Sequence, residues 1–390
     1  MNTNLKILLL IDFSEEYGRA LLRGITRYSQ VYGPWSFCKM PPFVREKYGV
    51  NGILDFARKW GAQGIVGQLD NTQEISKLID SGICIVAQDF KERFTEIPNI
   101  TSDYDKAGAM AAGYFLAKGY KNFAFYGFTE IVWSRERALG YSNRLKEAGY
   151  TVHSFNNTQK NKHQLWYYSQ SPLSDWLLKL PKPVALFACD DNQASHIAEA
   201  CKLAGIRVPD EVSILGVDND EMICNMSNPP TSSICLDTEN AGFKVAELME
   251  NMILKKTDHF DDIFVESTSI FSRQSTDIFA VNDPEVLKAL QFIRETITQK
   301  IQVSDVIKNV ALSRRAIEKR FVDTIERSIY QEILFRKMER ATQLLLQTKY
   351  SILEIACQSG FDDDKNFARM FQKIHQLTPL QYRKKFGTVH

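Results

Sequence analysis

The feature that most constrains the fold is a pair of helices joined by a two-residue turn, which the last 110 residues contain twice. The first helix of each pair is short, and we expect it from 303 or 304 to 310 and again at 352–359. The second helix is longer, at 314–322 in the first pair and at 362–374 in the second. Two helices joined by a tight turn form the unit that places its second helix in the major groove of DNA. The repeat therefore predicts an all-α, DNA-binding tandem helix-turn-helix domain.

Residues that favour helix caps mark where these elements begin. Asp283, with Pro284 at the first helical position, is expected to start a further helix at 285–299, ahead of the repeat. Within the repeat, a serine or an aspartate stands directly before three of the helices: Ser313, Ser351 and Asp362.

A long helix expected at about 330–347 joins the two units. Its apolar residues keep the spacing of one buried face, at Ile333, Leu334, Met338, Ala341, Leu344 and Leu345. Joined by one stiff helix, the two recognition helices could enter adjacent major grooves about 34 Å apart on one side of the duplex.

Charge is distributed unevenly along the chain. Residues 281–390 hold 19 Lys and Arg against 13 Asp and Glu, a net charge of +6, whereas residues 1–280 carry 29 against 34, a net charge of −5. Basic charge concentrated in one segment is typical of a nucleic-acid-binding domain. The alternative is a plain helical bundle with basic surfaces, and the repeat favours the DNA-binding interpretation over it.

The outward faces of the recognition helices mix basic, amide and small residues, as the reading of base edges requires. On the first recognition helix, the outward-facing residues are Arg314, Arg315, Glu318 and Lys319.

Four stretches of this segment resemble the DNA-binding domain of the AraC/XylS family, over about 100 residues: SILEIA at 351–356, GF at 360–361, NFARMFQK at 366–373 and TPLQYR at 378–383. The resemblance implies base-facing roles for Arg315, Glu318 and Lys319 in the first recognition helix. For the second recognition helix it implies a DNA-binding set of Asp364, Lys365, Asn366, Arg369 and, at the end of the shared motif, Lys373.

The segment departs from that family in two ways. Glu326 and Gln376 stand where the family usually has glycine, which suggests a somewhat different turn after each recognition helix. The second recognition helix also begins with three acids, of which Asp362 and Asp363 are expected to be a cap and a partner of the helix dipole. Asp364 could accept a hydrogen bond from a cytosine amino group, or could disfavour other DNA sites.

The first 280 residues alternate short apolar runs with helical patterns. Strands are expected at 7–11, 64–67, 83–87, 122–127, 184–188 and 212–216, and helices at 15–29, 72–81, 134–148 and 192–204. Strands that are apolar throughout, joined by amphipathic helices, indicate α/β lobes with parallel sheets and helices on both faces. No GxGxxG follows the first strand and no GxxxxGK[ST] occurs, so neither a dinucleotide site nor a P-loop is indicated.

Sheets of this kind bind ligands at the carboxyl ends of their strands. The polar residues at those positions are Asp12, Ser14, Gln68, Asp70, Gln88, Asp89, Arg135, Arg137, Asp190, Asp191, Asp218 and Asn219. Carboxylates and guanidinium groups can each bridge two hydroxyls, so the set suits a small neutral polyol better than an anion. The alternative role for any one of the acids is a helix cap or a surface loop, and Asp191 is expected to cap the helix at 192–204.

Five stretches resemble the effector domain of the LacI/GalR family: RALGY at 137–141, FACDDNQA at 187–194, GIRVPDEVSILGVD at 205–218, PPTSS at 229–233 and RQST at 273–276. The resemblance implies an effector domain of the periplasmic-binding-protein type over 1–279, followed by the DNA-binding domain at 283–390. One lobe would hold about 1–103 with later crossover segments, and the other about 104–235. By the same resemblance, Arg137, Asp190 and Asp218 would hold the effector from the C-terminal lobe. The expected effector-binding set is completed by residues at or near the other strand ends and in the first lobe: Tyr17, Arg19, Gln68, Asp89 and Trp133.

The order of these two domains, together with stretches at 122–127, 272–277 and 378–383, resembles the xylose operon regulator family. The resemblance implies a transcription activator that responds to D-xylose and acts as a homodimer on promoter DNA, with RNA polymerase as a further partner. A sugar that bridges the lobes would favour their closed state. Arabinose, ribose, mannose and glucose stay open as alternative effectors.

The composition argues against several other classes. No run of about 18 apolar residues exists, so no membrane-spanning helix is expected. The seven cysteines are scattered and form no CxxC pair, which predicts free thiols in a reducing cytoplasm rather than disulfides or a zinc site. No cofactor is expected.

Two further functions are compatible with parts of the sequence. A sugar-acting enzyme could use Asp190 and Asp191 as acid and base, but the six histidines are isolated and adjacent residues at a strand end usually point apart. The chain is therefore predicted not to be an enzyme. Binding to RNA or to DNA without sequence preference would instead show steep salt dependence with little discrimination.

Overall fold

The computed structural model describes residues 4–40, 42–69, 72–156, 170–254, 260–277 and 283–386. The chain forms two compact units, one of residues 1–113 and 122–277 and the other of residues 114–121 and 278–390. No helix in the described ranges is both long enough and apolar enough to cross a membrane.

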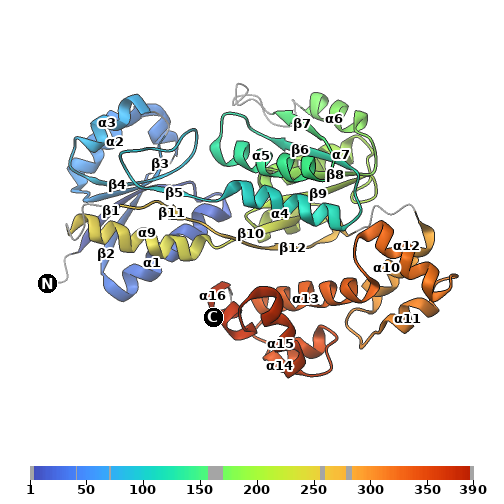
Figure 1. Cartoon of the computed structure of the whole chain (residues 1–390). Coiled ribbons are helices and arrows are strands. Elements are labelled where there is room, and N and C mark those ends of the chain that lie inside the picture. The colour runs from blue at the N-terminus through green and yellow to red at the C-terminus, as the bar shows by residue number, and fades with distance from the viewer. Residues whose placement is uncertain are drawn as a thin grey trace. The chain divides into compact units, whose positions relative to one another are not determined.

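The first unit contains two α/β lobes, each built on a six-stranded sheet in the described part of the chain (Figure 1). In the first lobe the strand order is β11-β5-β4-β3-β1-β2, and all neighbours are paired in parallel. These strands are β1 (Leu5–Leu10), β2 (Trp35–Lys39), β3 (Gly64–Gln68), β4 (Cys84–Gln88), β5 (Asn99–Thr101) and β11 (Ile263–Phe264).

The second lobe has the strand order β12-β10-β9-β8-β6-β7. Its pairings are parallel except at one edge, where β12 runs antiparallel to β10. The prediction of parallel sheets is therefore confirmed, with a single antiparallel edge strand that the sequence pattern did not indicate. These strands are β6 (Asn122–Gly127), β7 (Val152–Asn156), β8 (Val184–Ala188), β9 (Val212–Val217), β10 (Ser232–Leu236) and β12 (Ser267–Phe271).

Helices cover both faces of each sheet. Those of the first lobe are α1 (Glu16–Tyr32), α2 (Pro42–Trp60), α3 (Thr72–Ile79) and α9 (Thr238–Ile253). Between and beside the strands of the second lobe the helices are α4 (Tyr104–Ala117), α5 (Val132–Glu147), α6 (Gln170–Lys179), α7 (Asp191–Leu203) and α8 (Glu221–Met226).

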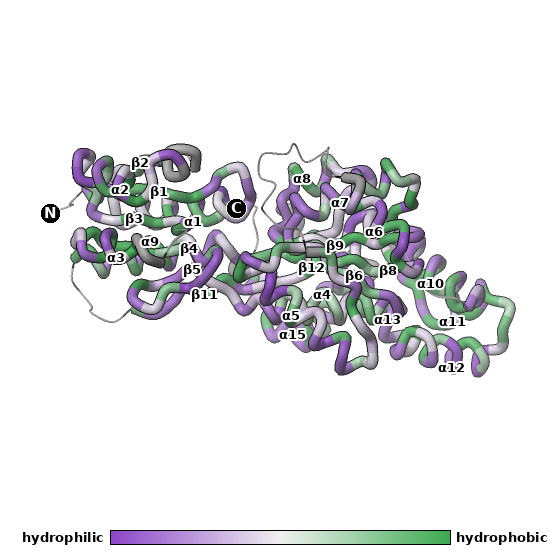
Figure 2. Tube along the Cα trace, turned by 90° about the horizontal axis from the view of Figure 1, so that it is seen from above, coloured by the Kyte–Doolittle hydropathy of each residue, from purple (hydrophilic) through white to green (hydrophobic). Residues whose placement is uncertain are grey.

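The core strands are buried on both faces, which is why they read as unbroken apolar runs in the sequence. Strands β8 and β9 are buried at every residue. Figure 2 shows the same pattern as hydrophobic stretches along the strands, alternating with hydrophilic stretches in the helices and loops. Because β8 and β9 leave no face for solvent, the charged side chains beside them gather just beyond the ends of these strands.

The chain passes between the two sheets three times, since β1–β5 and β11 lie in the first sheet and β6–β10 and β12 in the second. The second passage places α9 against α1 at very short range. A Cβ atom added to Gly24 would lie 1.9 Å from the carbonyl oxygen of Glu239, and one added to Gly242 would lie 2.1 Å from that of Leu21. Glycine at these two positions therefore permits the close packing that fixes α9 to the first lobe.

The second unit is helical, and the tandem helix-turn-helix prediction is confirmed (Figure 1). Its helices are α10 (Pro284–Thr296), α11 (Val303–Lys308), α12 (Arg314–Ile325), α13 (Ile329–Gln347), α14 (Ile352–Gln358), α15 (Asp364–His375) and α16 (Pro379–Phe386). The recognition helices are α12 and α15, and each follows the short helix of its own unit, α11 and α14, along the chain. At 19 residues, α13 is roughly 28 Å long.

Helix α13 contributes to two separate hydrophobic cores. Ile329 and Ile333 pack into the first core with α10, α11 and α12. Met338, Ala341 and Leu345 pack into the second core with α14, α15 and α16. One helix is thus shared by both helix-turn-helix units, as its apolar spacing predicted.

Most expected helix caps are confirmed, and two are wrong. Asp283, Ser313 and Ser351 each accept a hydrogen bond from the first turn of the helix that follows. The cap of α7 is Asp190 rather than Asp191, which is already helical. The cap of α15 is Asp363 rather than Asp362. In both cases two or three adjacent acids could serve as the cap, and composition alone did not select between them.

The expectation of an altered turn after each recognition helix is also wrong. Glu326 and Gln376 adopt left-handed backbone conformations, with φ of 58° and 57°. Their N–H groups donate to the carbonyls of Val322 and Gln372, which closes each helix as a glycine would. A residue with a Cβ is strained in this conformation, so both positions store unfavourable backbone energy.

We expect Gln376→Gly to stabilise the second helix-turn-helix unit by about 1 kcal/mol, because glycine adopts the left-handed conformation without strain. Gln372→Gly is a matched control on an exposed face of the same helix, and it should destabilise by about 0.5 kcal/mol. Denaturant unfolding followed by circular dichroism measures both changes. If the two substitutions shift stability in the same direction, the strain at Gln376 is not significant.

Candidate functional site

The candidate ligand site lies where the carboxyl ends of the parallel strands of both lobes meet. Four side chains there each have a buried polar atom with no hydrogen-bond partner among the described residues: Tyr17 Oη, Gln88 Oε1, Arg137 Nε and Asp218 Oδ1. We call these four residues the interlobe cluster. Tyr17 and Gln88 belong to the first lobe, and Arg137 and Asp218 to the second.

Arg137 is the most constrained member of the interlobe cluster. Its side chain is 4% exposed, and its guanidinium lies 5.3 Å from the ring centre of Tyr104 and 5.2 Å from that of Trp133. Nη1 donates to the carbonyl oxygen of Cys189, and Nη2 lies 3.8 Å from Asp218 Oδ1. The aromatic rings and these two contacts fix the guanidinium, and its Nε–H is left as an unpaired donor.

Asp218 is held by an unusual backbone turn at the end of β9. Asp218 and Asn219 both have positive φ, at 99° and 51°. Asn219 is fixed by its N–H to Ser233 Oγ at 2.9 Å and by Arg273, whose Nη2 donates to Asn219 Oδ1 at 2.8 Å. Burial raises the pKa of Asp218 to about 6, while the charge of Arg137 opposes the rise.

Asp89 is fully buried, and its carboxylate is occupied by neighbouring protein groups. Thr101 and Tyr104 donate to its two oxygens at 2.7 Å each, and Arg93 Nε lies 3.3 Å from Oδ2. Burial raises its pKa, and the two hydrogen bonds oppose this. Asp89 therefore holds Tyr104 by its hydroxyl, while the Tyr104 ring lies beneath the Arg137 guanidinium.

Tyr17 places a neutral hydroxyl in the same region. Burial raises its pKa well above the usual value, and the negative charges of Asp89 and Asp218 raise it further. The phenol thus stays protonated and can both donate and accept a hydrogen bond.

The two adjacent acids at the end of β8 have different partners. Asp190 accepts from the N–H of Gln193 at 2.7 Å, and Asp191 accepts from the N–H of Asp220 at 2.7 Å. Burial raises the pKa of both carboxyls. Each holds a backbone segment in place, which is a structural task that gives no support to an acid–base pair.

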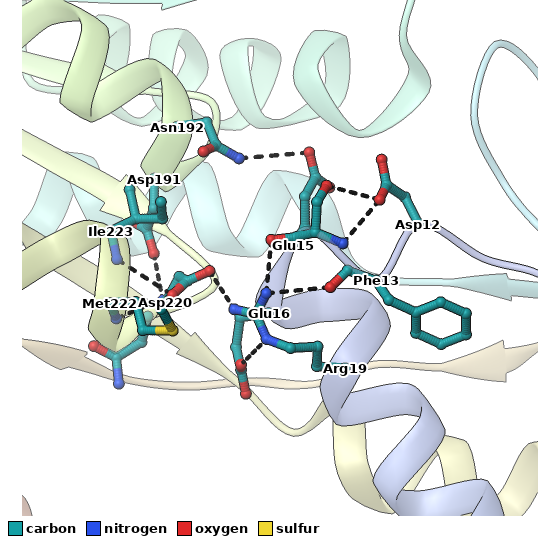
Figure 3. A network of polar contacts seen from close by, with 12 residues as sticks. Asp12, Phe13, Glu15, Glu16, Arg19, Asp191, Asn192, Asp220, Met222 and Ile223 are labelled. Carbon is teal, nitrogen blue, oxygen red and sulfur yellow. Dashed lines mark hydrogen bonds and ion pairs between the residues drawn. The ribbon is translucent and has the colours of Figure 1, made fainter. Parts of the chain in front are cut away.

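Direct contacts also join the two lobes beside the interlobe cluster (Figure 3). Arg19 Nη2 lies 2.5 Å from Asp220 Oδ2, and Asn192 Nδ2 donates to Glu15 Oε1 at 3.5 Å. Much of the Glu15 side chain is exposed, yet its carboxyl is packed among other acids. Desolvation and then the charges of four aspartates raise its pKa to about 8: Asp190, Asp218, Asp12 and Asp220.

The structure brings most of the expected effector residues together. Three of them belong to the interlobe cluster: Tyr17, Arg137 and Asp218. Three others lie beside it: Asp89, Trp133 and Asp190. Gln68 stands at the carboxyl end of β3, on the same edge of the first sheet. Arg135 is exposed and donates to the carbonyl of Thr129, away from the cluster. Asp70 lies outside the described residues.

The sequence patterns did not single out several residues that shape the site. Tyr104, Thr101 and Arg273 act through side chains that come from segments with no strand-end signal. Asp220 could have been found, because an aspartate three residues beyond the end of β9 and directly before a helix is a typical N-cap.

The candidate DNA-binding face is built by the outward sides of α12 and α15. Arg314, Arg315 and Lys319 are exposed on α12, and Glu318 is half-buried in an ion pair with Arg314 at 2.9 Å. On α15 the exposed residues are Asp364, Lys365, Arg369 and Lys373. Asn366 is half-buried and accepts from Arg369 Nη2 at 3.2 Å.

Two α/β lobes with polar side chains at the strand ends, followed by a tandem helix-turn-helix domain, define a transcription regulator with a ligand-binding domain. Comparisons with known families agree with this class. The family model described as a periplasmic binding protein-like domain matches residues 112–276. A model described as a helix-turn-helix domain matches residues 306–385.

The chain is similar over nearly its whole length to xylose operon regulatory proteins. It is 29% identical to the protein of Haemophilus influenzae, with 97% of this chain and 98% of the relative covered. The protein of Escherichia coli K12 is 28% identical, with 97% and 96% covered. A solved structure described as the xylose-binding transcription activator XylR is 26% identical, with a TM-score of 0.61 and coverage of 99% of this chain and 100% of that one. Since these relatives are regulators, the chain is a DNA-binding regulator rather than an enzyme, as the sequence predicted.

We expect the stability of the protein to depend on the ionisation of Asp218. The pKa of Asp218 is about 6 in the folded state, above its usual 3.8, so the protonated side chain favours folding. This contribution to the free energy of unfolding is largest below pH 3.8. This contribution is lost as the pH rises towards 6 and does not change further above it. Relative to Asp218→Asn, the wild-type protein should therefore lose up to about 3 kcal/mol between pH 4 and pH 7.

Denaturant unfolding of both proteins at several pH values measures this difference. The Asn side chain does not titrate in this range, so subtracting its curve removes the contributions of the other buried acids. A difference that stays constant from pH 4 to pH 7 would contradict the raised pKa.

Proposed function

We propose that the interlobe cluster binds a monosaccharide and that this ligand controls DNA binding. The observation that carries the proposal is the set of unpaired polar atoms in the interlobe cluster. Leaving buried donors and acceptors unpaired costs about 1–3 kcal/mol each, so a ligand that pairs them gains that free energy. A sugar hydroxyl can donate to Asp218 or Gln88 and can accept from Arg137, which matches both kinds of atom.

D-xylose is the effector that we propose, because the relatives that match this chain along its whole length are described as regulators of xylose operons or as xylose-binding. A second candidate is another monosaccharide, among arabinose, ribose, mannose and glucose. The acids near the cluster favour any neutral sugar over an anionic ligand, because a negative charge would be repelled by Asp218 and Asp190.

The proposed mechanism is a shift of population between open and closed lobes. Effector contacts would come from Tyr17, Gln68 and Asp89 in the first lobe and from Trp133, Arg137, Asp190 and Asp218 in the second. Arg19, which the sequence placed among the effector contacts, would act instead through its ion pair with Asp220. A sugar meets both sets only when the lobes are together, so binding favours closure. The boundary between the ligand-binding domain, 1–279, and the DNA-binding domain, 283–390, is also a proposal, supported by the division of the chain at residue 278.

In the DNA-binding domain we propose that two helices read bases in adjacent major grooves. On α12 the reading residues would be Arg314, Arg315, Glu318 and Lys319, and on α15 they would be Asp364, Lys365, Asn366, Arg369 and Lys373. The length of α13, roughly 28 Å, supports the spacing, because adjacent major grooves lie about 34 Å apart. We further propose that the chain acts in the cytoplasm as a homodimeric activator that contacts RNA polymerase. Sedimentation analysis with and without DNA tests the dimer.

We expect Asp218→Ala and Tyr17→Phe each to weaken xylose binding by about tenfold or more, because each removes one hydrogen-bonding group from the ligand. Arg135→Ala is the matched control, since Arg135 lies on α5 beside Arg137 but is exposed. Calorimetric titration with xylose and the four alternative sugars measures the affinities. Binding of one of the alternatives but not of xylose would overturn the choice of effector, and unchanged affinity in Asp218→Ala would overturn the site.

We expect Arg369→Ala to weaken binding to the native promoter by about tenfold or more, since one base contact is worth about 1–3 kcal/mol. Lys308→Ala is the control, because it removes the same charge from an exposed position at the end of α11, outside both recognition helices. Gel-shift titration against a scrambled competitor measures both. Equal losses in the two variants, or equal affinity for promoter and competitor, would indicate that only charge is being recognised.

A further inference from the structure

The ion pair between Arg19 and Asp220 joins the two lobes directly (Figure 3). Arg93 and Glu136 also pair across the lobes, at 2.6 Å, but Glu136 is 29% exposed and is therefore less shielded from water than Asp220. Nη2 of Arg19 lies 2.5 Å from Oδ2 of Asp220. The Asp220 side chain is 6% exposed and that of Arg19 is 31% exposed. A pair of this kind is partly shielded from water, so its attraction is larger than that of a fully exposed pair.

Asp220 is fixed in place on the second lobe. Its Oδ1 accepts from the N–H groups of Met222 and Ile223, at 3.1 and 3.3 Å, and so caps α8. Its own N–H donates to Asp191 Oδ2 at 2.7 Å. Because Oδ1 and the backbone are held in this way, Oδ2 is the oxygen that is presented to the first lobe.

Arg19 is fixed equally well on the first lobe. Its Nη1 donates to the carbonyls of Ser14 and Phe13, at 2.6 and 3.3 Å, and its Nε donates to Glu16 Oε2 at 3.2 Å. These contacts attach the guanidinium to the loop that follows β1. Only Nη2 reaches across, and it ends on Asp220.

The bonding of Arg19 contrasts with that of Arg137. Arg137 keeps a buried Nε–H without a partner, as expected of a group that binds a ligand. In Arg19 all three nitrogens are engaged by protein oxygens. Its geometry fits a contact between lobes better than a contact with an effector.

The charges around the ion pair indicate how it affects the free energy of bringing the two lobes together. Glu15, on the first lobe, faces Asp190, Asp218 and Asp220 of the second, and desolvation together with these acids raises its pKa to about 8, so its negative charge is disfavoured when the lobes are together. Arg19 lies between Glu16 of the first lobe and Asp220 of the second, and its positive charge attracts both carboxylates. The attraction to Asp220 acts only when the lobes are together.

We propose that Arg19 and Asp220 form a latch that sets the equilibrium between open and closed lobes before any ligand binds, and that Arg19 is a positioning residue rather than an effector contact. The inference rests on the proposed function, in which closure accompanies binding. Removing the latch lowers the closed fraction, and the apparent affinity for the effector falls in proportion. The sugar-contacting groups themselves are unchanged.

The latch is tested by measuring the distance between the lobes in the full chain. Spin labels attached through unnatural amino acids at Val31 and Leu203, which are exposed on the first and second lobes, avoid the native cysteines. Pulsed electron paramagnetic resonance then gives the distance distribution without sugar. We expect Arg19→Ala to shift this distribution to longer distances and to weaken xylose binding by about tenfold, with saturating xylose restoring the short distance.

Two comparisons separate the latch from other effects of substitution. Arg23→Ala is the matched control, because Arg23 lies one turn along α1 and pairs only with Glu16 and Glu239, both in the first lobe. It should leave the distribution unchanged. Asp220→Asn keeps an oxygen for the α8 cap and removes the charge, so it should reproduce Arg19→Ala, and the double variant should be no more open than either single one.

The outcomes distinguish the latch from the proposed function. If Arg19→Ala has the sugar-free distribution of the wild type, or if the effects of the two substitutions add fully, the latch is wrong even though sugar binds. If no monosaccharide binds the wild type but Arg19→Ala still opens the lobes, the latch stands and the proposed function fails.

Discussion

The cost of burying unpaired polar groups is the constraint on which the ligand-binding unit depends. The central parallel strands are buried on both faces, so charged residues gather just beyond their ends, where Tyr17 of the first lobe lies near Arg137 and Asp218 of the second. In the proposed mechanism, closing the lobes would bury Tyr17, Gln88, Arg137 and Asp218, each with a polar atom that has no hydrogen-bond partner among the described residues. Closure would then be unfavourable by itself and favourable with a ligand that carries several hydroxyls.

The aromatic and acidic residues around Arg137 hold its guanidinium in one orientation. A guanidinium that is fixed by Tyr104, Trp133 and the Cys189 carbonyl cannot rotate to find a partner of its own. Asp89 in turn fixes Tyr104 by its hydroxyl. Because each group is held by another, a ligand meets donors and acceptors that are already oriented, which lowers the entropic cost of binding.

Some features of this protein follow from local sequence patterns and others do not. Apolar runs such as 184–188 and the apolar spacing of α13 predicted their elements, because burial of one face or both leaves a direct record in the sequence. The choice of Asp190 over Asp191 as a cap depends on tertiary contacts, since Asp191 is used to bind the backbone of Asp220. The left-handed conformation of Glu326 was missed for a related reason: the packing of the following helix imposes it against the preference of the residue.

Arg19 and Arg137 show how one residue type can have two different bonding patterns. Arg137 is buried with a donor that has no partner among the described residues, so in the proposed mechanism a change there would alter which ligand fits. Arg19 donates to protein oxygens of both lobes, so a change there would alter how readily the lobes meet, whatever the ligand. Ligand specificity and the ligand concentration that triggers a response would then depend on different side chains. A regulator built in this way could change its threshold without changing the sugar that it recognises.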